Sequence, residues 1–110
     1  MVYIHVDVEK VREMADALAR EPKTWDDLVW LFAEAELRLR PALAGGILYQ
    51  GGVESREVEL DPALIVNQPA EKDIRELAAV VASLGPPLQD LHWLIAERRF
   101  LYARAKAGVG

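Results

Sequence analysis

The sequence predicts a mainly helical α+β domain. It consists of two similar helical hairpins in a pseudo-two-fold four-helix arrangement, with a small β element inserted between them. Three observations predict this fold. Apolar residues recur at helical spacing in four segments, the last two segments repeat the first two, and the stretch between them is rich in glycine and β-like residues. The 110 residues, 52% hydrophobic and 28% charged, are typical of a single globular domain over 1–110.

The beginning of the chain predicts a short strand and then a helix. Val2, Ile4 and Val6 alternate with more polar neighbours, which gives the strand one apolar face. The spacing then becomes helical, in the series Val8, Val11, Met14, Ala15 and Leu18. Pro22 and Lys23 mark the turn that follows this helix.

A second helix is predicted over residues 25–40. Thr24 is a good N-cap, and Asp27 three residues later completes a relative of the capping box. The helix is expected to end near Arg40, because Pro41 and the glycines at 45 and 46 disfavour its continuation.

Residues 46–61 predict a β-hairpin. Two β-like stretches, Ile47–Gln50 and Val53–Leu60, flank the turn-forming pair Gly51–Gly52. The alternation in the second stretch is imperfect, and Leu64–Val66 is a candidate for one further short strand. The hairpin would place a small sheet beside the helices.

The remainder of the chain predicts a second helical hairpin. An apolar stripe runs through Ile74, Leu77, Ala78 and Val81 at helical spacing. Gly85–Pro87 forms the turn, and the last helix covers residues 88–105, with Gly108 beyond it.

An internal repeat relates the two hairpins. A shift of 63 positions aligns residues 9–45 with residues 72–108 without a gap, and 13 of the 37 aligned pairs are identical. Five of the identical pairs are alanines, but the pair Trp30/Trp93 is harder to attribute to composition. We interpret the repeat as a duplication; two unrelated hairpins of similar spacing are the alternative.

Composition argues against most enzyme chemistry. The chain has no cysteine and two histidines, which removes thiolate nucleophiles and cysteine-based metal sites. Neither a phosphate-binding glycine loop nor a nucleophile-elbow motif occurs. We therefore expect no catalytic residue, no cofactor and no metal. Without a long apolar segment or a leader pattern, a cytoplasmic protein away from membranes is expected. The scarcity of amide side chains beside abundant Glu and Arg is thermophile-like.

The two predicted tryptophan-bearing helices are apolar on more than one face. Trp30 and Leu37 lie off the main apolar stripe of the first, and Trp93 and Phe100 lie off that of the second. A chain of 110 residues has few other residues with which to cover two apolar faces on each of these two helices. We expect a second copy of the chain to cover them in a C2 homodimer, with these four residues at the interface. The small sheet is the alternative cover.

Repeated charges suggest repeated ion pairs. Arg12 and Glu34 in the first hairpin correspond to Arg75 and Glu97 in the second, so we expect each hairpin to be bridged by one Arg–Glu pair. A divalent metal held in the bundle by four carboxylates is the alternative, although the Glu-x-x-His pairing of such sites is missing. Those carboxylates would be Asp27, Glu34, Asp90 and Glu97.

A winged-helix DNA-binding protein is the alternative fold over residues 8–60. Its recognition helix would be Glu36–Leu43, with Arg38 and Arg40 facing DNA and Arg56 on the wing. The net charge of −5 opposes phosphate binding, and no turn residue separates the required helices. The sequence therefore favours a non-catalytic oligomerising or protein–protein interaction module over a nucleic-acid partner.

Overall fold

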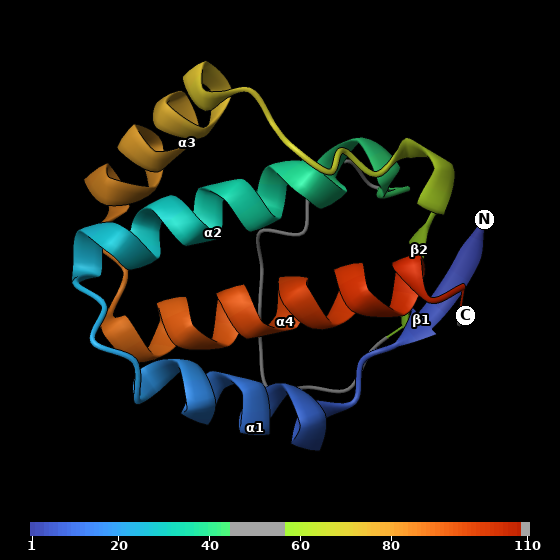
Figure 1. Ribbon diagram of the computed structural model, residues 1–110, viewed down its shortest axis with the longest axis horizontal. Coiled ribbons are helices and arrows are strands. Elements are labelled where there is room, and N and C mark those ends of the chain that lie inside the picture. Colours follow the sequence, from blue (N-terminus) through green and yellow to red (C-terminus); the bar gives the residue numbers. More distant parts are fainter. Residues whose placement is uncertain (45–56, 109–110) are drawn as a thin grey trace.

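The computed structural model describes residues 1–44 and 57–108. These residues form four α-helices, two short 3₁₀ helices and a two-stranded antiparallel sheet (Figure 1). The elements follow one another as β1 (Val2–His5), α1 (Val8–Ala19), α2 (Trp25–Leu39), η1 (Arg40–Ala42), β2 (Glu57–Leu60), η2 (Pro62–Leu64), α3 (Glu71–Leu84) and α4 (Leu88–Lys106). The predicted mainly helical α+β class is confirmed.

Local capping defines where the helices begin and end. The Asp7 side chain accepts the N–H of Lys10 at the start of α1. At the start of α2, Thr24 and Asp27 form the predicted capping box, each side chain accepting the other residue's backbone N–H. Gly85 ends α3 with φ of 61°, a left-handed conformation that glycine adopts at no steric cost.

The helices recur at the spacing of the predicted repeat. α1 begins at Val8 and α3 at Glu71, while α2 begins at Trp25 and α4 at Leu88. Both intervals equal the 63-residue shift that aligns the two halves of the sequence.

The first helix of each repeat packs on the second helix of the other repeat, an arrangement that we call the exchange of partners. α1 packs on α4 and α3 packs on α2, while α2 and α4 contact each other in the centre. Figure 1 shows the resulting order α1, α4, α2, α3 across the molecule, with α2 and α4 running in the same direction. α4 is therefore covered on one side by α1 and on the other by α2.

The core consists of two hydrophobic clusters. One cluster joins the sheet to η1 and to the second half of α4, with Ile4, Val6, Leu39, Leu60, Phe100 and Leu101 among its buried members. The other lies toward the first halves of α2 and α4 and contains Leu18, Leu28, Val29, Phe32, Val81, Leu91 and Ile95. Along both central helices, the boundary between the clusters falls near Glu36 and Arg98.

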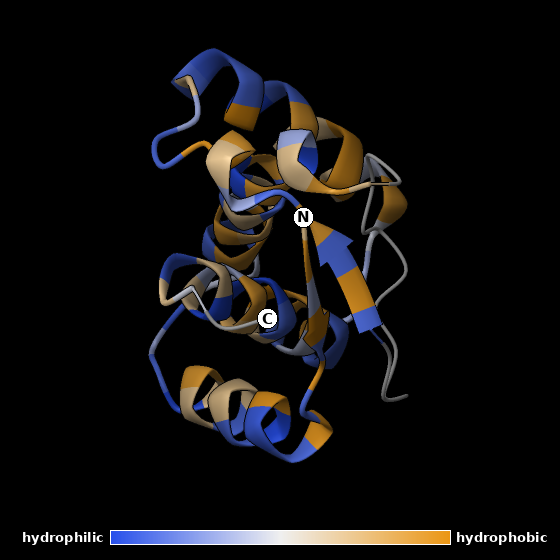
Figure 2. Cartoon of the chain, turned by 90° about the vertical axis from the view of Figure 1, so that its right-hand side faces the viewer, coloured by the Kyte–Doolittle hydropathy of each residue, from blue (hydrophilic) through white to orange (hydrophobic). Residues whose placement is uncertain are grey.

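The sheet lies at the end of the layer where α2 and α4 finish (Figure 2). β1 pairs with β2 in antiparallel register, Val2 opposite Leu60 and His5 opposite Glu57. The predicted N-terminal strand is thus confirmed, whereas most of the predicted hairpin over 46–61 lies outside the described residues. The further strand suggested at Leu64–Val66 is wrong. Asp61 caps a 3₁₀ turn there instead, and Pro62 suits the first position of that turn.

The region considered as a DNA-recognition helix is not a separate element. Glu36 to Leu39 form the last turn of the unbroken α2, and Arg40–Ala42 form η1. Glu36 is fully buried, so this face of α2 is unavailable to a nucleic acid. Among the described helices, none has the length and apolar character needed to cross a membrane.

Candidate functional site

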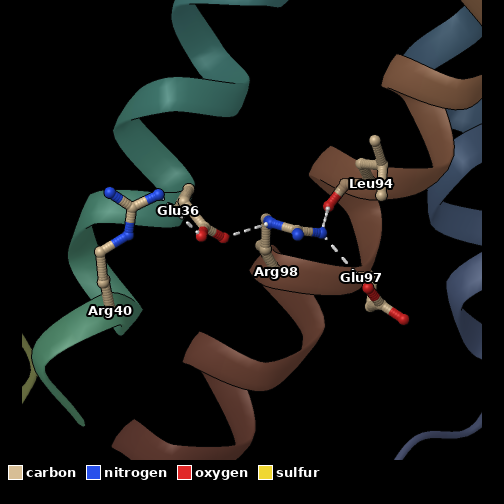
Figure 3. A network of polar contacts seen from close by, with 5 residues as sticks. All are labelled: Glu36, Arg40, Leu94, Glu97 and Arg98. Atoms are coloured by element: carbon tan, nitrogen blue, oxygen red, sulfur yellow. Dashed lines mark hydrogen bonds and ion pairs between the residues drawn. The ribbon is translucent and has the colours of Figure 1, made fainter. Parts of the chain in front are cut away.

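A network of charged side chains is buried where α2 and α4 meet. Arg98 of α4 is completely buried, and its Nε donates to Glu36 Oε1 on α2 over 2.8 Å. Arg98 Nη1 donates to the Leu94 carbonyl oxygen over 3.0 Å and to Glu97 Oε1 over 3.2 Å. Figure 3 shows Arg98 extended between the two helices toward Glu36.

The network is electrically balanced, which makes its burial tolerable. Glu36 and Glu97 are both fully buried, and Glu36 Oε2 accepts from Arg40 Nη2 over 3.1 Å. Two carboxylates thus face two guanidinium groups, and the Phe32 ring lies 4.8 Å from Arg98 Cζ. An ion left alone in this position would cost several kcal/mol by desolvation, roughly 3–5 kcal/mol when one partner is removed. The network therefore ties the register of α2 to that of α4.

A second and more exposed polar group joins α2, α4 and the segment before α3. Arg38 forms an ion pair with Glu34 at 3.3 Å, and its Nε donates to the Asn67 carbonyl oxygen over 3.1 Å. The Tyr102 hydroxyl donates to Asn67 Oδ1 over 2.8 Å, and the Arg38 guanidinium lies 5.7 Å from the Tyr102 ring centroid. The segment before α3 is thereby attached to both central helices.

A small pocket opens between these two groups. It has a volume of about 50 Å³ and is lined by Ala35 and Arg38 of α2 and by Arg98, Arg99 and Tyr102 of α4. We call it the arginine pocket. Arg99 is half-buried and forms no ion pair with any of the described residues. The lining therefore combines three guanidinium groups and one hydroxyl without a carboxylate.

The four predicted interface residues differ in burial, since one is in the core and three are half-buried. Phe100 is 3% exposed and lies in the core cluster beside the sheet, so its assignment to an interface is wrong. The reason is the exchange of partners between the hairpins, which places α4 between α1 and α2. Trp93 is half-buried against the same cluster, and Trp30 and Leu37 are also half-buried. Contact of these three with a second copy stays a prediction.

The predicted ion pairs across each hairpin are replaced by pairs within single helices. Arg12 pairs with Glu9 and Arg75 with Glu71, both exposed on their own helices. Glu34 pairs with Arg38, one turn further along α2. Glu97 contacts Arg98, its neighbour in α4. The cause is again the exchange of partners, since the first helix of each hairpin packs on the opposite repeat.

The four repeated carboxylates do not converge. Asp27 caps α2, and the backbone N–H of Thr24, followed by the Thr24 hydroxyl, holds the pKa of Asp27 below its ordinary value. Asp90 is exposed in the first turn of α4. Within the described ranges, no three acidic or histidine side chains lie close enough together to hold a metal ion.

The exposed apolar side chains include a group of three at the turn between α3 and α4. Val80 and Leu84 are one helical turn apart and are 54% and 62% exposed, and Leu88, which begins α4, is 50% exposed. Trp25 is half-buried nearby and donates from its indole nitrogen to the Pro86 carbonyl oxygen over 2.8 Å. We call residues 77–89 the α3–α4 corner.

The buried pair Glu36–Arg98 is not among the residues predicted from the sequence. A signal for it exists, because Arg98 follows Leu91 and Ile95 at helical spacing and Glu36 follows Leu28 and Phe32 in the same way. Opposite charges at core positions of two helices are the expected pattern for a buried ion pair.

Comparisons of the chain with protein-family models, with curated proteins and with solved structures found no match.

Proposed function

We propose that this chain is a non-catalytic interaction module that associates with a second copy of itself through the α3–α4 corner. The observation that carries the proposal is the exposure of Val80, Leu84 and Leu88, each of them at least half accessible. Large apolar side chains gathered at one place on a surface are typical of interfaces.

The composition of the corner favours a second copy as the occupant. Residues 77–89 contain no charged side chain, in a chain that is 28% charged and carries a net charge of −5. The equivalent residues of the first repeat, 14–26, contain Asp16, Arg20, Glu21, Lys23 and Asp26. Two copies meeting at the corner avoid the repulsion that their net charge produces elsewhere, and an isologous C2 contact is the commonest way to bury such a surface.

The expected association is weak. Completing the burial of three half-exposed aliphatic side chains on each copy contributes roughly 1 kcal/mol per side chain. The loss of rotational and translational freedom opposes this gain by at least about 4 kcal/mol. About 2 kcal/mol remains, which by itself gives a dissociation constant on the order of 30 mM. The flanking apolar residues of the corner, buried in the same contact, add the further roughly 2 kcal/mol that brings the constant to about 1 mM.

Sedimentation equilibrium over micromolar to millimolar protein tests the proposal with two variants that add the same charge. Val80→Glu places a carboxylate on the corner, whereas Ala17→Glu places it at the equivalent exposed position of the first repeat. We expect wild type and Ala17→Glu to dimerise with the same constant and Val80→Glu to stay monomeric, because charges at an apolar contact must be desolvated. Equal association of the two variants, or a monomeric wild type at millimolar concentration, would refute the proposal. Circular dichroism checks that both variants retain their helix content.

A further inference from the structure

We propose that the arginine pocket binds a small oxyanion of the size of one phosphate group. This inference is independent of self-association. The pocket lies where α2 packs on α4, and it shares no residue with the α3–α4 corner. It rests on the size of the pocket, on the chemistry of its lining and on the way its side chains are held in place.

The size of the pocket matches one small group. A volume of about 50 Å³ holds roughly three to five waters, since one water needs about 10–15 Å³. That room suits a phosphate, a sulfate or a phosphoryl group at the end of a larger ligand. It does not suit a buried nucleotide base or sugar.

Among the residues that the structure describes, one positive charge at the pocket has no acidic partner. The charge of Arg38 is balanced by Glu34, and Arg98 contacts both Glu36 and Glu97. Arg99 lacks an acidic partner within 1–44 and 57–108, although its side chain is half-buried. A half-buried guanidinium attracts an anion more strongly than an exposed one, because water screens it less. Arginine is also the side chain whose planar donor fork matches phosphate oxygens.

The donors around the pocket are held before any ligand arrives. Arg38 is fixed by Glu34 and by the Asn67 carbonyl oxygen, and its guanidinium stacks over Tyr102. The Tyr102 hydroxyl gives its single proton to Asn67 Oδ1, so Tyr102 holds the Arg38 guanidinium through its ring, and the guanidinium groups are the donors to the anion. A site that is already arranged loses less conformational entropy when its ligand binds.

The repeat explains why space exists at this point. Ala35 of α2 is the counterpart of Arg98 in α4, so two equivalent positions of the repeat face the pocket with side chains of very different length. Arg99 likewise corresponds to Glu36. The short side chain at Ala35 leaves the room, and the change from acid to base at the other pair supplies the positive charge.

A nuclear magnetic resonance titration of the full ¹⁵N-labelled chain with inorganic phosphate tests the inference. Ionic strength and pH are held constant by replacing chloride, and sulfate serves as a second tetrahedral probe. We expect saturable shifts in the Arg99 Nε–H signal and in the amides near Ala35. In Arg99→Gln the affinity for phosphate should fall by about tenfold or more, the effect of losing one charge-assisted hydrogen bond.

Arg104→Gln is the matched control. Arg104 lies on the same helix, is also half-buried and stacks on Phe100 at 5.0 Å, but it does not line the pocket. Its variant should bind phosphate within about twofold of wild type, and Arg99→Lys should fall between wild type and Arg99→Gln. Shifts that stay linear in phosphate, or equal losses in Arg99→Gln and Arg104→Gln, would overturn the inference.

Discussion

Replacing Glu36 by leucine should destabilise the fold through the charge left behind on Arg98. Both side chains are fully buried, and the 2.8 Å bond between Glu36 and Arg98 joins the two central helices. Removing one member of a buried ion pair costs about 3–5 kcal/mol of unfolding free energy. Arg98 keeps its contacts with the Leu94 carbonyl and with Glu97, so we expect the lower end of this range, about 3 kcal/mol.

Urea denaturation followed by circular dichroism measures this loss. Glu34→Leu is the control, because Glu34 lies in the same helix and pairs with Arg38, but both side chains are 29% exposed. An accessible pair of this kind contributes less than about 1 kcal/mol. In a thermal melt, the Glu36 variant should lose roughly 12–24 °C, given about 4–8 °C per kcal/mol for a chain of this size.

The double variant Glu36→Leu, Arg98→Met isolates the interaction from the loss of a side chain. Removing both charges eliminates the guanidinium left without Glu36, but it also takes from buried Glu97 its bond to Arg98, so we expect the double variant to recover about 1 kcal/mol relative to Glu36→Leu. A cost of Glu36→Leu no larger than that of Glu34→Leu, or additive effects of the Glu36 and Arg98 substitutions, would refute the reasoning.

Two further predictions concern single side chains. Phe100→Ala should lower the unfolding free energy by about 3–5 kcal/mol in urea denaturation, because Phe100 fills the core of a single copy. The constant for self-association should not change. A weakened dimer with unchanged stability would contradict this prediction. Asp27 has a lowered pKa in the folded state, so its carboxylate stabilises the fold above the ordinary pKa of 3.8 and loses this effect as pH falls through the folded value. The difference in unfolding free energy between wild type and Asp27→Asn should therefore shrink from pH 5 to pH 2.5, and a constant difference would show that the charge on Asp27 has no part in the cap.

Much of the candidate site was beyond reach of the sequence because it depends on which helix faces which. The arginine pocket requires Ala35 and Arg98 to lie on facing helices. The apolar periodicity of a helix shows which side is buried but not which other helix packs against that side. The same lack of information led to the misplacement of Phe100 at an interface. Charged residues in an apolar stripe, Glu36 and Arg98, were the available signal for the buried network.

The sequence by itself determined the four helices, the first strand and the capping box of Thr24 and Asp27, because turns, caps and apolar periodicity act between residues close along the chain. It also determined the 63-residue spacing at which the helices recur. Only the tertiary structure decided that α1 packs on α4 and α3 on α2, since the connections permit either arrangement and packing between distant residues selects one. That selection buries Glu36 with Arg98 and opens the arginine pocket beside them.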